Sequence, residues 1–407
     1  MQTFLASAVF IVTYAGLALG RIPGLRIDRA GLALVGASLM VLSGWLSLEE
    51  AFKAIDLETL TLLLGMMIIV GHLRVCGFFR LVTRLALSHA HSPFVLLCMI
   101  VFATGILSAF LVNDAICLVM APLVASITRK LGRNPIPYLL AVAMASNAGS
   151  VATITGNPQN MIVGVLSGIG YLDFAKALAP VAAAALVMTI LCIRLSYKTE
   201  FARFATFADS AGPARIHRAQ LLKTGFVAAA VMAAFFAGVS AAKAAIIGAA
   251  FLLLTRSVKP EKIYSEIDGS LLIMFAGLFV VVAGAEKLPF FQSLAFLGSY
   301  LQNAWILSGM TAAFSNLVSN VPAVLVLKPF LANIPDKQKA WEIVAMSSTF
   351  AGNLTLVGSL ANLIVAEQAK RNGTEISFGT HLMVGLPLTL LTLFFGTWWL
   401  AGQAPIL

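Results

Sequence analysis

The sequence predicts an all-α polytopic membrane protein, built from two inverted repeats that together hold about ten transmembrane helices and two re-entrant hairpins. Hydrophobic residues make up 60% of the 407 residues and charged residues 11%, and the mean hydropathy is +0.95. Apolar stretches of about 20 residues, long enough to cross a bilayer core, recur along the chain. This composition excludes a soluble globular domain, and polar breaks at matching places in two halves are typical of a secondary transporter.

The second half of the chain repeats the first. Residues 56–79 align without gaps on residues 268–291. The spacing Ser-x4-Asn-x8-Pro occurs at residues 108–122 and again at residues 315–329.

A third pair of segments is the richest in polar residues. Residues 143–163 match residues 345–365, and equivalent positions hold the pairs Thr153/Thr355, Gly156/Gly358 and Asn160/Asn362. The offset between the halves falls only from 212 to 207 to 202 residues, so the order of the elements is kept.

Residues 1–198 form the first predicted repeat. The stretch 94–127 is too long for one span, is broken at 112–114 and has basic residues on both sides. These features predict a re-entrant hairpin over about 93–128 with both ends in the cytoplasm, the alternative being a single tilted span. A broken helix is predicted over about 137–166, and ordinary spans are predicted at 4–20, 30–48, 57–73 and 177–197.

The second repeat, residues 224–407, follows a basic cytoplasmic linker at 199–223. It contains a predicted hairpin at about 304–332, a broken helix at about 341–367, and spans at 224–240, 243–255, 271–285 and 381–400. Five spans per half invert the second half relative to the first. With both termini outside, 20 of the 27 Lys and Arg residues fall on the cytoplasmic side, as the positive-inside rule requires. The net charge of +10 is thereby explained by loops rather than by nucleic-acid binding.

Four polar breaks interrupt the apolar stretches, at residues 112–114, 156–160, 319–322 and 358–362. Irregular backbone at bilayer depth must be buried in protein or line a polar cavity. Each break frees carbonyl groups for a cation and N–H groups for an anion. A lone Asn in a span more often bonds a neighbouring helix, but its recurrence on all four breaks favours a binding site. The candidate substrate- or ion-binding residues are Asn113, Asp114, Thr153, Gly156, Asn157, Asn160, Ser315, Ser319, Asn320, Thr355, Gly358, Ser359 and Asn362.

Asp114 is the only acidic residue in the hairpin spans. A carboxylate there is costly unless it is paired or protonated, so it is the predicted coupling site for H⁺ or Na⁺. The alternative is that Asp114 caps the half-helix that follows it. The histidines offer no nucleophile–base or metal pairing and the four cysteines are scattered. No catalytic residue, metal site or cofactor is therefore predicted.

The hairpin tips resemble a known signature. Residues 315–329, and more loosely 108–122, are similar to the tip motif of the ion transporter superfamily, which includes citrate transporters, divalent anion symporters and arsenite permeases. The Asn113-Asp114-Ala115 tip and the segments 156–160 and 358–364 look most like the arsenite-permease branch and its small bacterial permease relatives. The resemblance implies a scaffold domain, a moving transport domain, elevator-type alternating access and a homodimer.

We therefore expect a secondary active transporter of a small inorganic anion or oxyacid such as arsenite, in the bacterial inner membrane and proton-coupled through Asp114. The sodium symporters carry Ser-Asn-Thr at both tips, whereas this chain has Val112-Asn113-Asp114 and Ser319-Asn320-Val321, which disfavours sodium–dicarboxylate transport. A sodium-coupled carboxylate symporter and a sodium/proton antiporter are the alternatives. A soluble ATPase subunit docked on the cytoplasmic loops is left open, as are transport direction and stoichiometry.

Overall fold

The computed structural model describes residues 2–19, 27–82, 92–202, 218–254, 258–293, 297–332 and 334–402, which form helices and no strand. Most of the stretch between the first two predicted spans and most of the predicted linker at 199–223 lie outside these residues, as do both ends of the chain.

Seven described helices are long and apolar enough to cross a membrane, which confirms the predicted fold class of a helical membrane protein. They are α1 (Gln2–Leu19), α4 (Leu57–Val75), α6 (Pro93–Phe110), α10 (Tyr171–Ser196), α12 (Arg218–Phe236), α15 (Gly269–Glu286) and α22 (Phe378–Gly402). Two more predicted spans are the shorter apolar helices α2 (Arg29–Leu42) and α13 (Ala241–Leu253). Five short helices lie between the longer ones: α3 (Leu48–Ala54), α11 (Lys198–Ala202), α14 (Pro260–Tyr264), α16 (Pro289–Ser293) and α17 (Leu297–Tyr300).

Four long apolar stretches are each split into two helices, at or within a few residues of the predicted breaks. The two predicted hairpins are α6 with α7 (Asn113–Lys130), and α18 (Ala304–Val318) with α19 (Asn320–Leu331). The two predicted broken helices are α8 (Pro135–Ser150) with α9 (Pro158–Ser167), joined through the 3₁₀ turn η1 (Ile154–Gly156), and α20 (Lys337–Ala351) with α21 (Leu360–Arg371).

Four of the five asparagines at the predicted breaks are not in the unwound segments themselves; Asn157 is the exception. Asn113, Asn160, Asn320 and Asn362 each lie in the first turn of the helix that follows a break. The physical reason is that first-turn N–H groups have no partner within the helix, so a polar side chain there reaches both the free backbone and the adjacent break.

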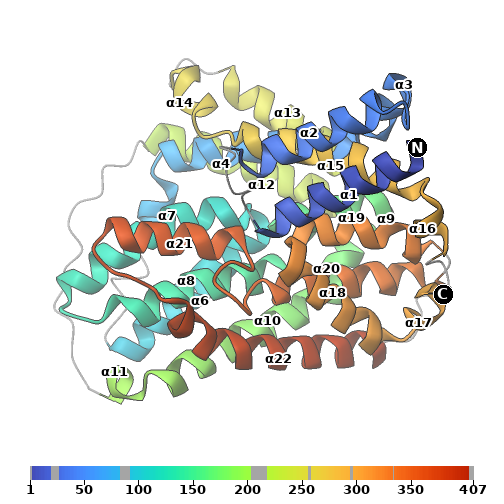
Figure 1. The fold of residues 1–407 in the computed structure, drawn as a ribbon. Coiled ribbons are helices and arrows are strands. Elements are labelled where there is room, and N and C mark those ends of the chain that lie inside the picture. Colours follow the sequence, from blue (N-terminus) through green and yellow to red (C-terminus); the bar gives the residue numbers. More distant parts are fainter. Residues whose placement is uncertain are drawn as a thin grey trace.

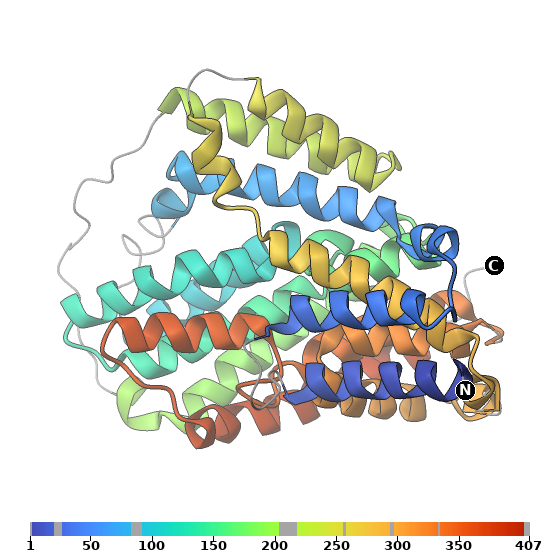
Figure 2. The same ribbon diagram turned by 45° about the horizontal axis from the view of Figure 1, so that its top comes forward.

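The helices form two packed groups (Figures 1 and 2). In the first, α2 packs along α15 and α4 packs along α13, with α1 and α12 beside them. The second contains the split helices together with α10 and α22. The hairpin tips and breaks of the second group face the starts of α2 and α15 in the first.

Close approach within the first group is reciprocal between the halves of the sequence. A Cβ on Gly65 of α4 would lie 2.7 Å from the backbone of Ala245 in α13, and a Cβ on Gly277 of α15 would lie 2.6 Å from the backbone of Ala33 in α2. Gly65 and Gly277 are separated by 212 residues, as are Ala33 and Ala245. Equivalent residues thus make equivalent contacts, which supports the prediction of duplicated halves.

Candidate functional site

The break between α8 and α9 is held by two asparagines. Asn157 caps α9 by accepting from the Asn160 N–H at 2.8 Å. The Asn160 side chain donates to the carbonyls of Ser150 and Thr153, both at 3.0 Å, and so joins the two ends of the unwound segment. Gly156 is required there, because a Cβ would lie 2.1 Å from the Ser150 carbonyl oxygen.

The break between α20 and α21 repeats this arrangement. The Asn362 side chain donates to the carbonyls of Gly352 at 2.7 Å and Thr355 at 3.0 Å. These two residues lie 202 positions after the acceptors of Asn160. The same pair of hydrogen bonds therefore organises both broken helices.

Asn147, near the end of α8, connects the two halves. Its amide oxygen accepts from Asn113 and from the Ser359 hydroxyl, both at 3.1 Å. Its amide nitrogen donates to Asn353 at 2.9 Å and to Asn362 at 3.2 Å. This fully buried side chain thus ties the α6–α7 tip to the break between α20 and α21.

Thr349 of α20, the residue equivalent to Asn147, makes the reciprocal connection. Its hydroxyl accepts from Asn157 at 3.2 Å and from Gln159 at 3.1 Å. Asn157 is in turn equivalent to Ser359. The break between α8 and α9 is therefore hydrogen-bonded to the end of α20, and the break between α20 and α21 to the end of α8. These bonds join the two breaks into one polar network.

The two hairpin tips differ in detail. Asp114, in the first turn of α7, makes no hydrogen bond or ion pair with the residues that the structure describes, and Val112 occupies the N-cap position. The alternative interpretation of Asp114 as a helix cap is therefore not what the structure shows. At the other tip, Ser319 adopts φ +81° and ψ 160°, and the Ser315 hydroxyl lies 2.7 Å from the Asn320 amide. When the Asn320 side-chain amide is oriented so that its nitrogen faces acceptors, its oxygen accepts from the Gln159 amide nitrogen at 3.1 Å.

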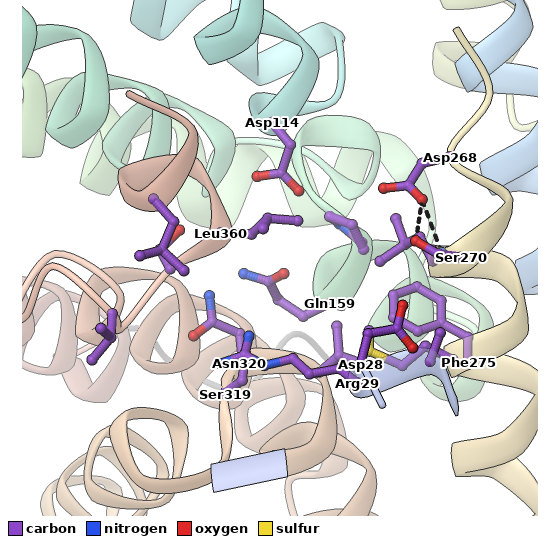
Figure 3. A pocket seen from close by; sticks show the side chains of 18 of the residues that line it. Asp28, Arg29, Asp114, Gln159, Asp268, Ser270, Phe275, Ser319, Asn320 and Leu360 are labelled. Atoms are coloured by element: carbon purple, nitrogen blue, oxygen red, sulfur yellow. Dashed lines mark hydrogen bonds between the residues drawn. The ribbon is translucent and has the colours of Figure 1, made fainter. Parts of the chain in front are cut away.

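A cavity of about 570 Å³ lies between the tips, the breaks and the first helix group (Figure 3). Gln159 lies near its centre, with Asp114 and Asp268 on one side and Ser319, Asn320 and Arg29 on the other. Such a volume suits a small solute, and the wall carries amides, hydroxyls and charged groups. Its polar lining residues are Asp28, Arg29, Asn113, Asp114, Gln159, Asp268, Ser270, Ser319, Asn320 and Ser359.

The predicted site residues divide into two sets. Those that line the cavity are Asn113, Asp114, Ser319, Asn320 and Ser359. Those that do not, and lie instead in the network behind it, are Thr153, Gly156, Asn157, Asn160, Ser315, Thr355, Gly358 and Asn362. The second set shapes the backbone of the site rather than its surface.

Sequence reasoning missed several residues of the site. Arg29 stands between the first two predicted spans and Asp268 just before another, so neither was a candidate binding residue; Asp268 also caps α15 by accepting from the Leu271 N–H at 3.1 Å. Asn147 and Thr349 stood within the compared segments, but they differ between the repeats and so escaped a search for identities. The signal available was that both are polar and occupy equivalent positions, 202 residues apart.

A smaller cavity of about 120 Å³ adjoins the same carboxylates. Asp114 and Asp268 line it as well, together with the ion pair between Arg74 and Glu266. The two aspartates therefore stand between the main cavity and a second charged space near the end of α4.

Three oxygens converge beside Gly358. A Cβ placed on this residue would lie 3.0 Å from Asn316 Oδ1, 3.0 Å from Thr355 Oγ1 and 3.1 Å from the Gly352 carbonyl oxygen. The Asn316 and Thr355 oxygens are buried without a hydrogen-bond partner among the described residues. A set of neutral oxygens is the donor set that a hard cation prefers.

Comparison with known proteins agrees with this architecture. A family model described as citrate transporter matches residues 9–351. A transporter of Mycobacterium tuberculosis is 32% identical, over 96% of each chain. The silicon efflux transporter LSI3 of Oryza sativa subsp. japonica is 28% identical, over 92% of this chain and 93% of its own. The putative transporter arsB of Dictyostelium discoideum is 23% identical, over 97% of this chain and 90% of its own.

Two solved structures share the fold. The YdaH transporter of Alcanivorax borkumensis has a TM-score of 0.58 at 16% identity, over 98% of this chain and 97% of its own. MtrF of Neisseria gonorrhoeae has a TM-score of 0.62 at 14% identity, over 100% of this chain and 96% of its own. At these identities the likeness shows a membrane-transporter fold. The citrate transporter family model, in contrast, matches most of the chain. This protein therefore belongs to the citrate transporter family, within the ion transporter superfamily.

Proposed function

We propose that this protein is an ion-coupled transporter of a small inorganic oxyacid or its anion, of the arsenite type, in the bacterial inner membrane. The observation that carries the proposal is the cavity at which both hairpin tips and both breaks meet. Amides and hydroxyls on its wall can donate to and accept from a solute that has several oxygens. The relatives named for silicon and for arsB support this substrate class.

The proposed coupling ion is a proton bound by Asp114. Asp114 and Asp268 line the same two cavities, so both carboxylates face the same confined space. Two negative charges in one such space repel, and a proton bound by either removes the repulsion. A proton on Asp114 would also remove a charge that opposes an incoming anion.

The proposed movement is of the elevator type. Asp114 belongs to the group of split helices, whereas Asp268 and Arg29 begin helices of the other group. Sliding one group past the other would separate Asp114 from Asp268 while the hydrogen-bonded unit of breaks and tips stays intact. Protonation of Asp114 would thus be linked to the position of the moving group.

The test is uptake into proteoliposomes driven by an imposed pH gradient. We expect Asp114→Asn to abolish gradient-driven uptake while leaving the folded fraction unchanged. The matched control is Asp173→Asn, an exposed aspartate of α10 that pairs with Lys176. Full gradient-driven uptake by Asp114→Asn would rule out the coupling role.

A second candidate, sodium-coupled carboxylate transport, is favoured by the oxygens beside Gly358. Asn316 and Thr355 offer buried acceptors that a cation would satisfy. This candidate predicts uptake that needs sodium and ignores the pH gradient, and a raised sodium requirement in Asn316→Ala. Proton-driven uptake in sodium-free buffer would reject it.

A further inference from the structure

We propose that Arg29 is the side chain that recognises the substrate, and that the site therefore selects a small oxyanion over a neutral oxyacid. The inference rests on the proposed transport function and narrows its substrate class. Among the described residues that line the cavity, which leave out residues 20–26, Arg29 is the only one with a cationic side chain.

Arg29 is placed to meet a solute at the second hairpin tip. It is the first residue of α2, it is half-buried, and its side chain extends along the side of the cavity that holds Ser319 and Asn320 (Figure 3). No salt bridge in the described part of the chain involves it. A guanidinium stays charged at every physiological pH, so a site that holds one without an ion-pair partner attracts an anion.

None of the three aspartates that line the cavity forms an ion pair with Arg29. Asp28 accepts from the Gly31 N–H at 2.8 Å and so caps α2. Asp268 accepts from the Ser270 hydroxyl at 2.6 Å and also from the Leu271 N–H in the first turn of α15. Asp114 lies on the opposite side of the cavity, beyond Gln159.

The geometry also lets groups from both helix groups bind one oxyanion. The planar guanidinium offers paired donors to two oxygens of an oxyanion, while Ser319, Asn320 and Gln159 supply hydroxyl and amide groups from the split helices. A bound oxyanion would then bridge α2 and the α18–α19 tip, which belong to different helix groups. A neutral oxyacid could use the amides and hydroxyls but would gain little from the charge.

The experiment compares four solutes in proteoliposomes at neutral pH: arsenate and phosphate as tetrahedral oxyanions, citrate as a carboxylate, and arsenous acid as a neutral oxyacid. We expect saturable uptake of at least one anion by the wild type. Arg29→Gln should raise the KM for that anion about 10- to 100-fold, the loss of a charge-assisted hydrogen-bond pair. Arg29→Lys, which keeps the charge and loses the fork, should fall in between. Arg371→Gln, an exposed arginine that pairs with Glu367, is the control and should match the wild type.

The outcomes separate the two claims. Wild-type protein that moves none of the four solutes contradicts the proposed function itself. An unchanged anion KM in Arg29→Gln, or wild-type preference for arsenous acid over every anion, contradicts the role of Arg29 alone. As a readout independent of transport, arsenate, phosphate or citrate should raise the unfolding temperature of the wild type and of Arg371→Gln, but not that of Arg29→Gln. Equal stabilisation of Arg29→Gln would also overturn the inference.

Discussion

Replacing Asn147 with Ala should destabilise the protein, because this side chain joins the two halves of the site. Its side chain makes four hydrogen bonds, to Asn113, Ser359, Asn353 and Asn362. Hydrogen bonds between membrane helices are worth about 0.6 kcal/mol each on average, which puts the loss at about 2–3 kcal/mol. All four partners are buried, but Asn113 and Ser359 line the cavity, where water can bond them, whereas Asn353 and Asn362 lie behind it.

The assay is denaturant unfolding in mixed micelles, together with transport in proteoliposomes. The control is Thr128→Ala, which also removes a fully buried polar group but one whose bonds to described residues go only to the Val124 and Ala125 carbonyls of its own helix. We expect Asn147→Ala to lose about 2–3 kcal/mol of unfolding free energy and most of its transport, and Thr128→Ala to lose less than about 1 kcal/mol. If the two variants unfold alike, the Asn147 connection between the halves does not stabilise the protein and the reasoning is wrong.

Two further changes test the backbone of the site. Gly156→Ala should lower the unfolding free energy by about 1–3 kcal/mol and impair transport, because the added methyl group meets the backbone of Ser150. Gly309→Ala in α18, where nothing lies within 4 Å of the added methyl group, is the control and should be neutral or slightly stabilising. The two variants are compared by their unfolding midpoints. Ser319→Gly should relieve the backbone strain at residue 319, whose φ of +81° and ψ of 160° are adopted essentially only by glycine. We expect the unfolding free energy to rise by about 1 kcal/mol and uptake to slow. A destabilised variant would show that the interactions of the Ser319 hydroxyl outweigh the strain.

The sequence was sufficient for the helical membrane fold because hydropathy reports it directly. It also located the breaks, because Gly, Pro and Asn grouped inside an apolar stretch favour a helix that is interrupted at that point. The recurrence of Asn160 and Asn362 pointed to the two residues that hold the unwound segments in the same way.

The cavity wall was harder to predict for a physical reason. Arg29 and Asp268 begin helices of a different group, and only tertiary packing brings them to the tips. A charge at the end of a span has the same sequence signature whether it faces water or a cavity. The membrane orientation, the inversion of the repeats and the dimer stay predictions.

The two halves share the residues that organise the backbone and differ in those that carry charge. Counting 212 residues on, Asp28 and Arg29 correspond to Ser240 and Ala241, which begin α13 just as Asp28 and Arg29 begin α2. Asp268 has an equivalent in Asp56, but on the opposite face of the predicted topology.

This asymmetry has a consequence for an elevator. When the split helices move to the other face, the substrate would meet the start of α13 instead of Arg29. The cation there is Lys243, an exposed ammonium without the planar fork of a guanidinium. The site should therefore hold an oxyanion more tightly on the side of Arg29, which the predicted topology makes cytoplasmic, and release it more readily on the other side. We expect the apparent KM to be lower from the cytoplasmic face, measured by comparing inside-out with right-side-out vesicles, and Arg29→Gln to remove that difference. Equal KM values from both faces of the wild type would mean that Arg29 travels with the substrate or does not bind it.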